Sequence, residues 1–120
     1  MRIERFEEIN AWKEARRLVK EIYSKSDANK RFYNDMRFKS QITSSAISIM
    51  SNIAEGFSRR SDKEFKQFLF ISKGSLAELQ SLLYVALDLN YISENDFKQL
   101  YDHSDMTAKM ISKFITYLNN

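Results

Sequence analysis

The chain has 120 residues and a net charge of +3 at pH 7, with 43% hydrophobic and 29% charged residues. These values are typical of one globular domain and exclude a disordered chain. The sequence contains no proline, no cysteine and only two glycines, which excludes turn-rich β folds, disulfide frameworks and thiolate sites.

Apolar residues recur at helical spacing through most of the chain, which predicts long helices joined by short breaks. Ser61, followed three residues later by Glu64, is typical of a capping box that opens a helix. Short connections favour antiparallel neighbours, so we expect an all-α, up-down-up-down four-helix bundle that occupies residues 1–120 as a single domain. The expected helices cover residues 8–24, 33–57, 61–89 and 93–118, and the first break covers residues 26–31.

The first two helices carry distinct patterns beside their apolar faces. In the second helix, polar residues follow one border of the apolar face. Polar groups beside a core need hydrogen-bond partners, so this row is expected to select one neighbouring helix and one register. The residues of the row are Gln41, Ser45, Ser48, Asn52 and Glu55. The first helix is expected to bury Ile9, Trp12, Ala15, Val19, Ile22 and Tyr23.

The third helix carries apolar or small residues on two sides, so we expect both sides to be buried. Gly74, in its middle, costs about 1 kcal/mol relative to alanine and is therefore expected to admit the backbone of another chain. We expect self-association through this second face; the alternative is scattered surface apolar residues, which need no explanation. The expected interface consists of Phe70, Gly74, Ala77, Ser81, Tyr84 and Val85, and Ile47, Met50, Met106, Met110 and Tyr117 also lie off the main seams.

Positive charge is concentrated in the first part of the chain. Residues 1–73 hold 16 Lys and Arg against 10 Asp and Glu, whereas residues 74–120 hold 3 against 6. Four cations of the first helix recur at i, i+3, i+4 and i+7 and form one stripe, while Glu14 and Glu21 are expected to point elsewhere. A second cluster is expected at the turn between the second and third helices. The stripe is Lys13, Arg16, Arg17 and Lys20, and the turn cluster is Arg59, Arg60, Lys63 and Lys66.

Basic surfaces of this kind suit the phosphates of a nucleic acid, and an oligomer would multiply them. The expected topology places the turn cluster at the same end of the bundle as Arg2 and Arg5. Most aromatic residues serve the core seams, so base stacking and sequence readout are not expected. The alternative interpretation is a solvated basic face without an anionic partner.

Signals for an enzyme are weak. His103 is the only histidine, so it cannot supply the paired Glu-x-x-His motifs of a di-iron bundle, and an exposed histidine is the favoured interpretation. Glu55 and Glu78, each beside an apolar seam, are candidates for a general acid and base. No substrate-binding motif accompanies them, which favours structural carboxylates that accept hydrogen bonds. We therefore expect no enzymatic activity, no cofactor and no metal.

Two segments, Ser51-Asn-Ile-Ala-Glu-Gly56 and Gly74-Ser-Leu-Ala-Glu78, are the most specific in the chain. Together with Ala11-Trp12-Lys13 they resemble the bacterial four-helix bundle proteins encoded in intervening sequences of the 23S ribosomal RNA gene, and the resemblance covers essentially the whole chain. It implies a ring-like homopentamer, and since the family has no established enzymatic activity or cofactor, it implies no catalytic residues. It also implies a nucleic-acid connection, through the host RNA gene and through related accessory proteins of retroelement reverse transcriptases. The chain departs from the family at Thr43 and Ser44, where a basic pair is usual.

The combined expectation is a non-enzymatic oligomeric scaffold that binds RNA or a nucleoprotein through the two basic sites. The alternative is a protein–protein adaptor that binds no nucleic acid. The first residues contain no apolar run, and no stretch reaches the roughly 18 apolar residues of a spanning helix. We therefore expect neither a signal peptide nor a membrane partner, and a cytoplasmic location.

Overall fold

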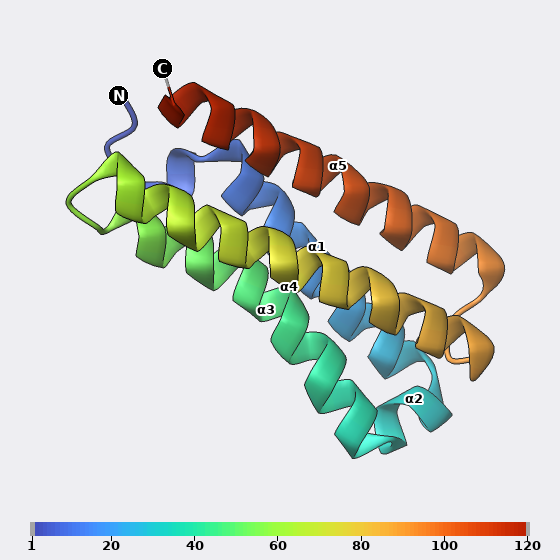
Figure 1. The fold of residues 1–120 in the computed structure, drawn as a ribbon. Coiled ribbons are helices and arrows are strands. Elements are labelled where there is room, and N and C mark those ends of the chain that lie inside the picture. Colours follow the sequence, from blue (N-terminus) through green and yellow to red (C-terminus); the bar gives the residue numbers. More distant parts are fainter. Residues whose placement is uncertain (1, 120) are drawn as a thin grey trace.

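The computed structural model describes residues 2–119, which form a rod of helices measuring 45 × 22 × 20 Å. Four long helices lie side by side along the rod, so the expected helical bundle is confirmed (Figure 1). A short additional helix lies at one end of the rod. The elements are a 3-10 turn, η1 (Phe6–Glu8), and the helices α1 (Asn10–Ala28), α2 (Lys30–Asn34), α3 (Met36–Phe57), α4 (Asp62–Asp88) and α5 (Glu94–Asn119).

The helices pack in a closed order, because α3 contacts α4, α4 contacts α5, and α1 contacts both α3 and α5. Ser72 donates a hydrogen bond to the Ile49 carbonyl at 2.9 Å, and the hydroxyls of Ser48 and Ser75 lie 2.9 Å apart. Further along α3, Gly56 lies beside Phe65 and Phe68, so positions advance along α3 as they recede along α4 and the two helices run antiparallel. No helix within residues 2–119 has the length and apolar character needed to span a membrane.

The break after α1 differs from the expectation. α1 continues to Ala28, and only Asn29 leaves the helical conformation before α2 begins. The Asn29 side chain accepts a hydrogen bond from the Phe32 N–H at 3.0 Å, and Asp35 accepts one from the Phe38 N–H at 3.2 Å. These are N-caps, so a polar break over residues 26–31 and a single helix over residues 33–57 were wrong expectations.

The core lies between the four long helices. On α1, Leu18 is fully buried although it lay outside the expected apolar face, and Tyr23 is 38% exposed although it was expected inside. Neighbouring helix positions point about 100° apart, so α1 buries Ile22 and turns Tyr23 to the surface. Trp12 and Val19 are partly buried at the margin of the core.

The close approach of α3 and α4 depends on Gly56. A Cβ atom added there would lie 2.6 Å from the Cβ of Phe68 and 2.9 Å from Cδ1 of Phe65. Gly74 is different, because an added Cβ would meet no atom within 4 Å. In this chain the backbone approach is therefore made at Gly56, while Gly74 faces outward.

The polar row on α3 selects its neighbour through one residue. The Ser48 hydroxyl reaches Ser75 on α4, and Asn52 donates to the Ser48 hydroxyl at 3.0 Å. Ser45 is buried but donates to a carbonyl of its own helix at 2.8 Å, and the two ends of the row are exposed. A row acting as a whole across the interface was therefore a wrong expectation.

Candidate nucleic-acid interface

The basic stripe of α1 lies on the outer side of the bundle and borders an open groove. Because the four cations recur at helical spacing, they share one face of α1. The groove has a volume of about 460 Å³, which is within the usual range for ligand sites. Its lining residues are Glu7, Trp12, Lys13, Arg16, Arg17 and Lys20.

The carboxylates near this groove are paired with particular cations. Glu7 contacts Arg5 at 2.9 Å, and hydrogen bonds from its own backbone N–H and from Arg5 lower the pKa of Glu7. The hydrogen bond to Glu7 in turn raises the pKa of Arg5. Glu14 forms an ion pair with Arg17, so the expectation that Glu14 points away from the stripe was wrong. Within residues 2–119, three stripe cations have no carboxylate oxygen within 4.0 Å: Lys13, Arg16 and Lys20.

The turn cluster lies between α3 and α4. Arg59 pairs with Glu55 at 3.1 Å, and Lys66 donates a hydrogen bond to the side-chain oxygen of Asn119 at 2.6 Å. Figure 1 shows this turn at the same end of the rod as the first residues of the chain, and η1 contacts α3 there. The stripe lies on α1, whereas the turn cluster lies between α3 and α4 and at the start of α4, so the two basic sites belong to different elements. The other two cations of the turn cluster, Arg60 and Lys63, are exposed.

His103 is held between two carboxylates, so the expectation of an exposed histidine was wrong. Its side chain is 13% exposed, with Nε2 at 2.8 Å from Glu14 and Nδ1 at 2.8 Å from Glu21. Each ring nitrogen therefore faces a carboxylate oxygen of α1 at hydrogen-bond distance. His103 thereby joins α5 to α1 and also fixes Glu14 beside Arg17. Because 89 positions separate His103 from Glu14, no local pattern indicated this contact.

A second contact that the sequence did not reveal lies at the far end of the rod. The Tyr91 hydroxyl donates a hydrogen bond to Asp35 at 2.6 Å. This bond, followed by the one from the Phe38 N–H, lowers the pKa of Asp35. The same contact with Asp35 raises the pKa of Tyr91, since the phenol proton is held by the carboxylate. The pair fixes the start of α3 to the segment that precedes α5.

Glu55 and Glu78 do not form a pair. Both are exposed, whereas buried or half-buried positions beside the apolar seams were expected. Glu55 does accept a hydrogen bond, from Arg59 at 3.1 Å. Ser48 lies level with Ser75, which places the two carboxylates on opposite sides of that contact, about 15 Å apart along the helices. Within the described part of the chain, no group of three or more His, Cys, Asp or Glu residues is arranged to hold a metal.

The residues of the expected self-association interface lie on the outer side of α4. Phe70 is 57% exposed and Val85 is 39% exposed. Gly74, Ala77, Ser81 and Tyr84 are exposed as well, as are Ile47, Met106 and Tyr117 outside α4. Met50 and Met110, also expected off the main seams, instead pack partly against the core.

The family model of the 23S rRNA-intervening sequence proteins matches residues 7–113. The chain belongs to this family. The membership expected from the two specific segments is therefore confirmed.

Among solved structures, this member of the 23S rRNA-intervening sequence protein family is similar to a crystal structure of a protein of unknown function from the S23 ribosomal protein family of Bacteroides thetaiotaomicron. The TM-score is 0.76 at 20% identity, with 88% of this chain and 97% of that chain covered. This likeness shows the fold. Comparison with the curated proteins found no match.

Proposed function

We propose that the protein is a non-enzymatic, cytoplasmic scaffold that self-associates and binds RNA or a nucleoprotein through its basic surfaces. The observation that carries the proposal is the α1 groove, where four cations meet. Three of these, Lys13, Arg16 and Lys20, have no carboxylate partner within residues 2–119. Cations free of acidic partners are available to phosphate groups, and each phosphate contact releases counterions. The family description, which refers to 23S rRNA, supports the same kind of ligand.

Self-association is supported by the outer face of α4. Monomeric proteins rarely expose a large contiguous apolar surface, and this helix exposes Phe70, Ile71 and Tyr84 at 57%, 51% and 51%. The outward-facing Gly74 leaves room for the close approach of a second chain at the centre of that face. We propose a homo-oligomer built on this face, with five chains as the resemblance to the family implies.

RNA binding is tested by fluorescence anisotropy with a labelled single-stranded RNA at several salt concentrations. Three phosphate contacts predict a slope of about −2 in log K against log salt, which is a loss of about 20-fold between 50 and 200 mM. Lys13→Glu, Arg16→Glu and Lys20→Glu in one variant are expected to abolish binding. Binding that does not change with salt would contradict the proposal.

The matched control makes the same change of charge on α5, with Lys98→Glu, Lys109→Glu and Lys113→Glu. The control variant is expected to keep most of its affinity, because these lysines lie outside the α1 groove. An equal loss in both variants would show that net charge alone, rather than the groove, determines binding.

Assembly is tested by light scattering on a size-exclusion column. A mass near five chains for the natural protein and a smaller mass for Gly74→Leu are expected, since a leucine would fill the space above the backbone at Gly74. A monomeric natural protein would overturn the assembly. The adaptor alternative is favoured instead if assembly and capture of a protein partner persist while no RNA binds at low salt.

A further inference from the structure

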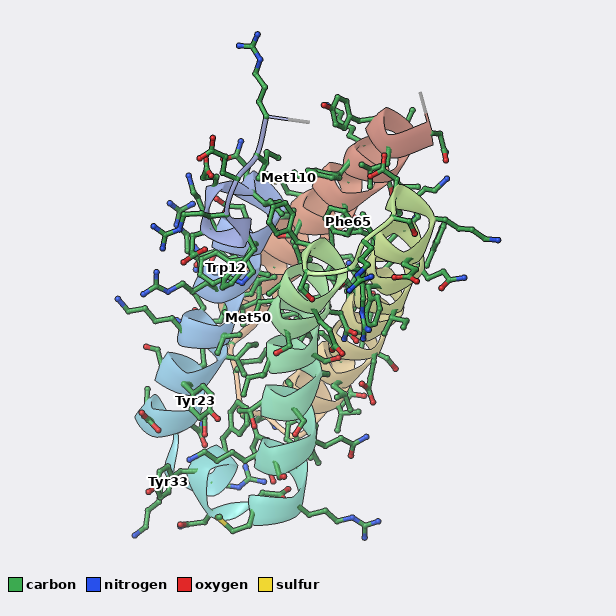
Figure 2. The ribbon with its side chains drawn as sticks, turned by 90° about the vertical axis from the view of Figure 1, so that its left-hand side faces the viewer. Trp12, Tyr23, Tyr33, Met50, Phe65 and Met110 are labelled. Atoms are coloured by element: carbon green, nitrogen blue, oxygen red, sulfur yellow. The ribbon has the colours of Figure 1, made fainter. Side chains whose placement is uncertain are left out.

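Two exposed tyrosines and one partly buried tryptophan lie on the side of the bundle formed by α1 and α2. Tyr23 is 38% exposed and Tyr33 is 49% exposed, while Trp12 is partly buried and lines the α1 groove. Figure 2 shows the three labelled side chains along one side of the rod. The expectation that base stacking is absent rested on aromatic residues serving the core seams, and Tyr23 does not serve the core.

Cations lie between these aromatic residues. Trp12, Arg16 and Lys20 are four positions apart, and Tyr23 follows three positions after Lys20, so the four share one face of α1. The rise of a helix places Tyr23 about 16 Å from Trp12 along α1. At about 3.4 Å per stacked nucleotide, this span matches about five nucleotides of one strand.

Two of the aromatic rings already hold a cation. The Arg16 guanidinium carbon lies 5.8 Å from the centroid of the Trp12 ring, and the Lys39 ammonium lies 3.9 Å from that of the Tyr33 ring. A cation beside an accessible ring offers a phosphate contact next to a surface on which a base can stack. Proteins that bind single-stranded nucleic acids typically combine a basic groove with aromatic side chains on which the bases stack.

We propose that this face of α1 is a stacking platform for a single-stranded nucleic acid. The inference rests on the proposed function and specifies its ligand. Bases stack on Trp12 and Tyr23, and the phosphates between them lie against Arg16 and Lys20. A duplex offers phosphates but keeps the faces of its bases inside the stack, so it gains the charge contacts alone.

The test uses the single tryptophan of the chain as its probe. The full-length protein is titrated with a single-stranded RNA of ten nucleotides, with the duplex of the same sequence and with inorganic polyphosphate. Binding is followed by anisotropy for the labelled RNAs and by displacement of labelled RNA for the polyphosphate. The single strand is expected to quench the fluorescence of Trp12 and to bind more tightly than the duplex at equal salt. Polyphosphate is expected to compete without quenching.

Variants at Tyr23 give a second readout that does not depend on Trp12. Tyr23→Ala is expected to weaken single-strand binding about 5- to 150-fold, which corresponds to the loss of one stacked base. Tyr23→Phe keeps the ring and is expected to retain the affinity. The matched control is Tyr117→Ala, which removes an exposed tyrosine from α5 and is expected to change nothing.

The outcomes separate this inference from the proposed function. If the single strand binds without quenching, the duplex binds equally well and Tyr23→Ala keeps its affinity, the stacking platform is refuted while RNA binding through charge stands. If no RNA binds to the natural protein at low salt, the proposed function fails, and the platform fails with it.

Discussion

The two glycines allow a paired test of where the chain packs against itself. Gly56→Ala and Gly74→Ala each add one methyl group to a helix. At Gly56 the new carbon would lie 2.6 Å from the Cβ of Phe68, an atom fixed to the α4 backbone, so α3 and α4 must move apart. At Gly74 the new carbon meets nothing within 4 Å.

The two substitutions are expected to change the folding stability in opposite directions. Overpacking of a close helix contact costs about 1–3 kcal/mol, and alanine in place of glycine in a helix recovers at most about 1 kcal/mol. Gly56→Ala is therefore expected to lower stability by about 1–2 kcal/mol net, whereas Gly74→Ala is expected to raise it by up to about 1 kcal/mol. For a domain of this size, these changes correspond to a Tm lower by about 4–8 °C and higher by about 4 °C.

Urea denaturation followed by circular dichroism measures both changes. The protein concentration is varied 100-fold, because assembly through α4 would add stability at high concentration. The gain for Gly74→Ala is expected at low concentration, where the isolated chain is measured. If Gly56→Ala is as stable as the natural protein, the close approach of α3 and α4 is refuted. A loss in Gly74→Ala at low concentration would refute the outward position of Gly74.

Three further predictions concern polar contacts. His103→Ala is expected to lower the free energy of unfolding by about 1–2 kcal/mol in urea denaturation, because the contacts of His103 with Glu14 and Glu21 are lost. A change below about 0.5 kcal/mol would contradict a stabilising role for these contacts. Ser48→Ala is expected to cost about 1 kcal/mol, and a double-mutant cycle with Ser75→Ala should show coupling between the two residues. Tyr91→Phe is expected to raise the pKa of Asp35 towards its ordinary value in an NMR titration, and an unchanged pKa would refute the Tyr91 contact. The lowered pKa of Asp35 stabilises the fold at pH values above the carboxylate's ordinary range and stops doing so as the pH falls through the native pKa. The raised pKa of Tyr91 stabilises the fold below about pH 10, and this contribution is lost as the pH rises through the native value, so Tyr91→Phe should flatten both ends of the stability profile.

The sequence predicted what is periodic or local. The bundle follows from the helical spacing of apolar residues, and the cap at Ser61 follows from the local rule, since its side chain accepts a hydrogen bond from the Glu64 N–H at 3.2 Å. The stripe cations share one face of α1 because helix geometry alone fixes their relation. The family was recognisable from two short segments.

The remaining features depend on contacts between distant parts of the chain. Asn29 and Asp35 cap two successive helices only a few residues apart. In the sequence, two closely spaced caps are hard to distinguish from a single polar loop. His103 finds its partners on α1, and neither its neighbours nor its spacing indicate them. The exposure of Tyr23 depends on which of two adjacent apolar residues the bundle buries. That choice is made by packing rather than by periodicity.

The position of Gly56 also has a consequence for the speed of folding. Gly56, Phe65 and Phe68 meet beside a connection of four residues, 58–61, so they come together with little loss of loop entropy. Contacts that are close in sequence tend to be made before distant ones. The α3–α4 hairpin is therefore expected to be formed in the folding transition state. In stopped-flow experiments, Gly56→Ala should slow refolding more than it accelerates unfolding, whereas His103→Ala should mainly accelerate unfolding.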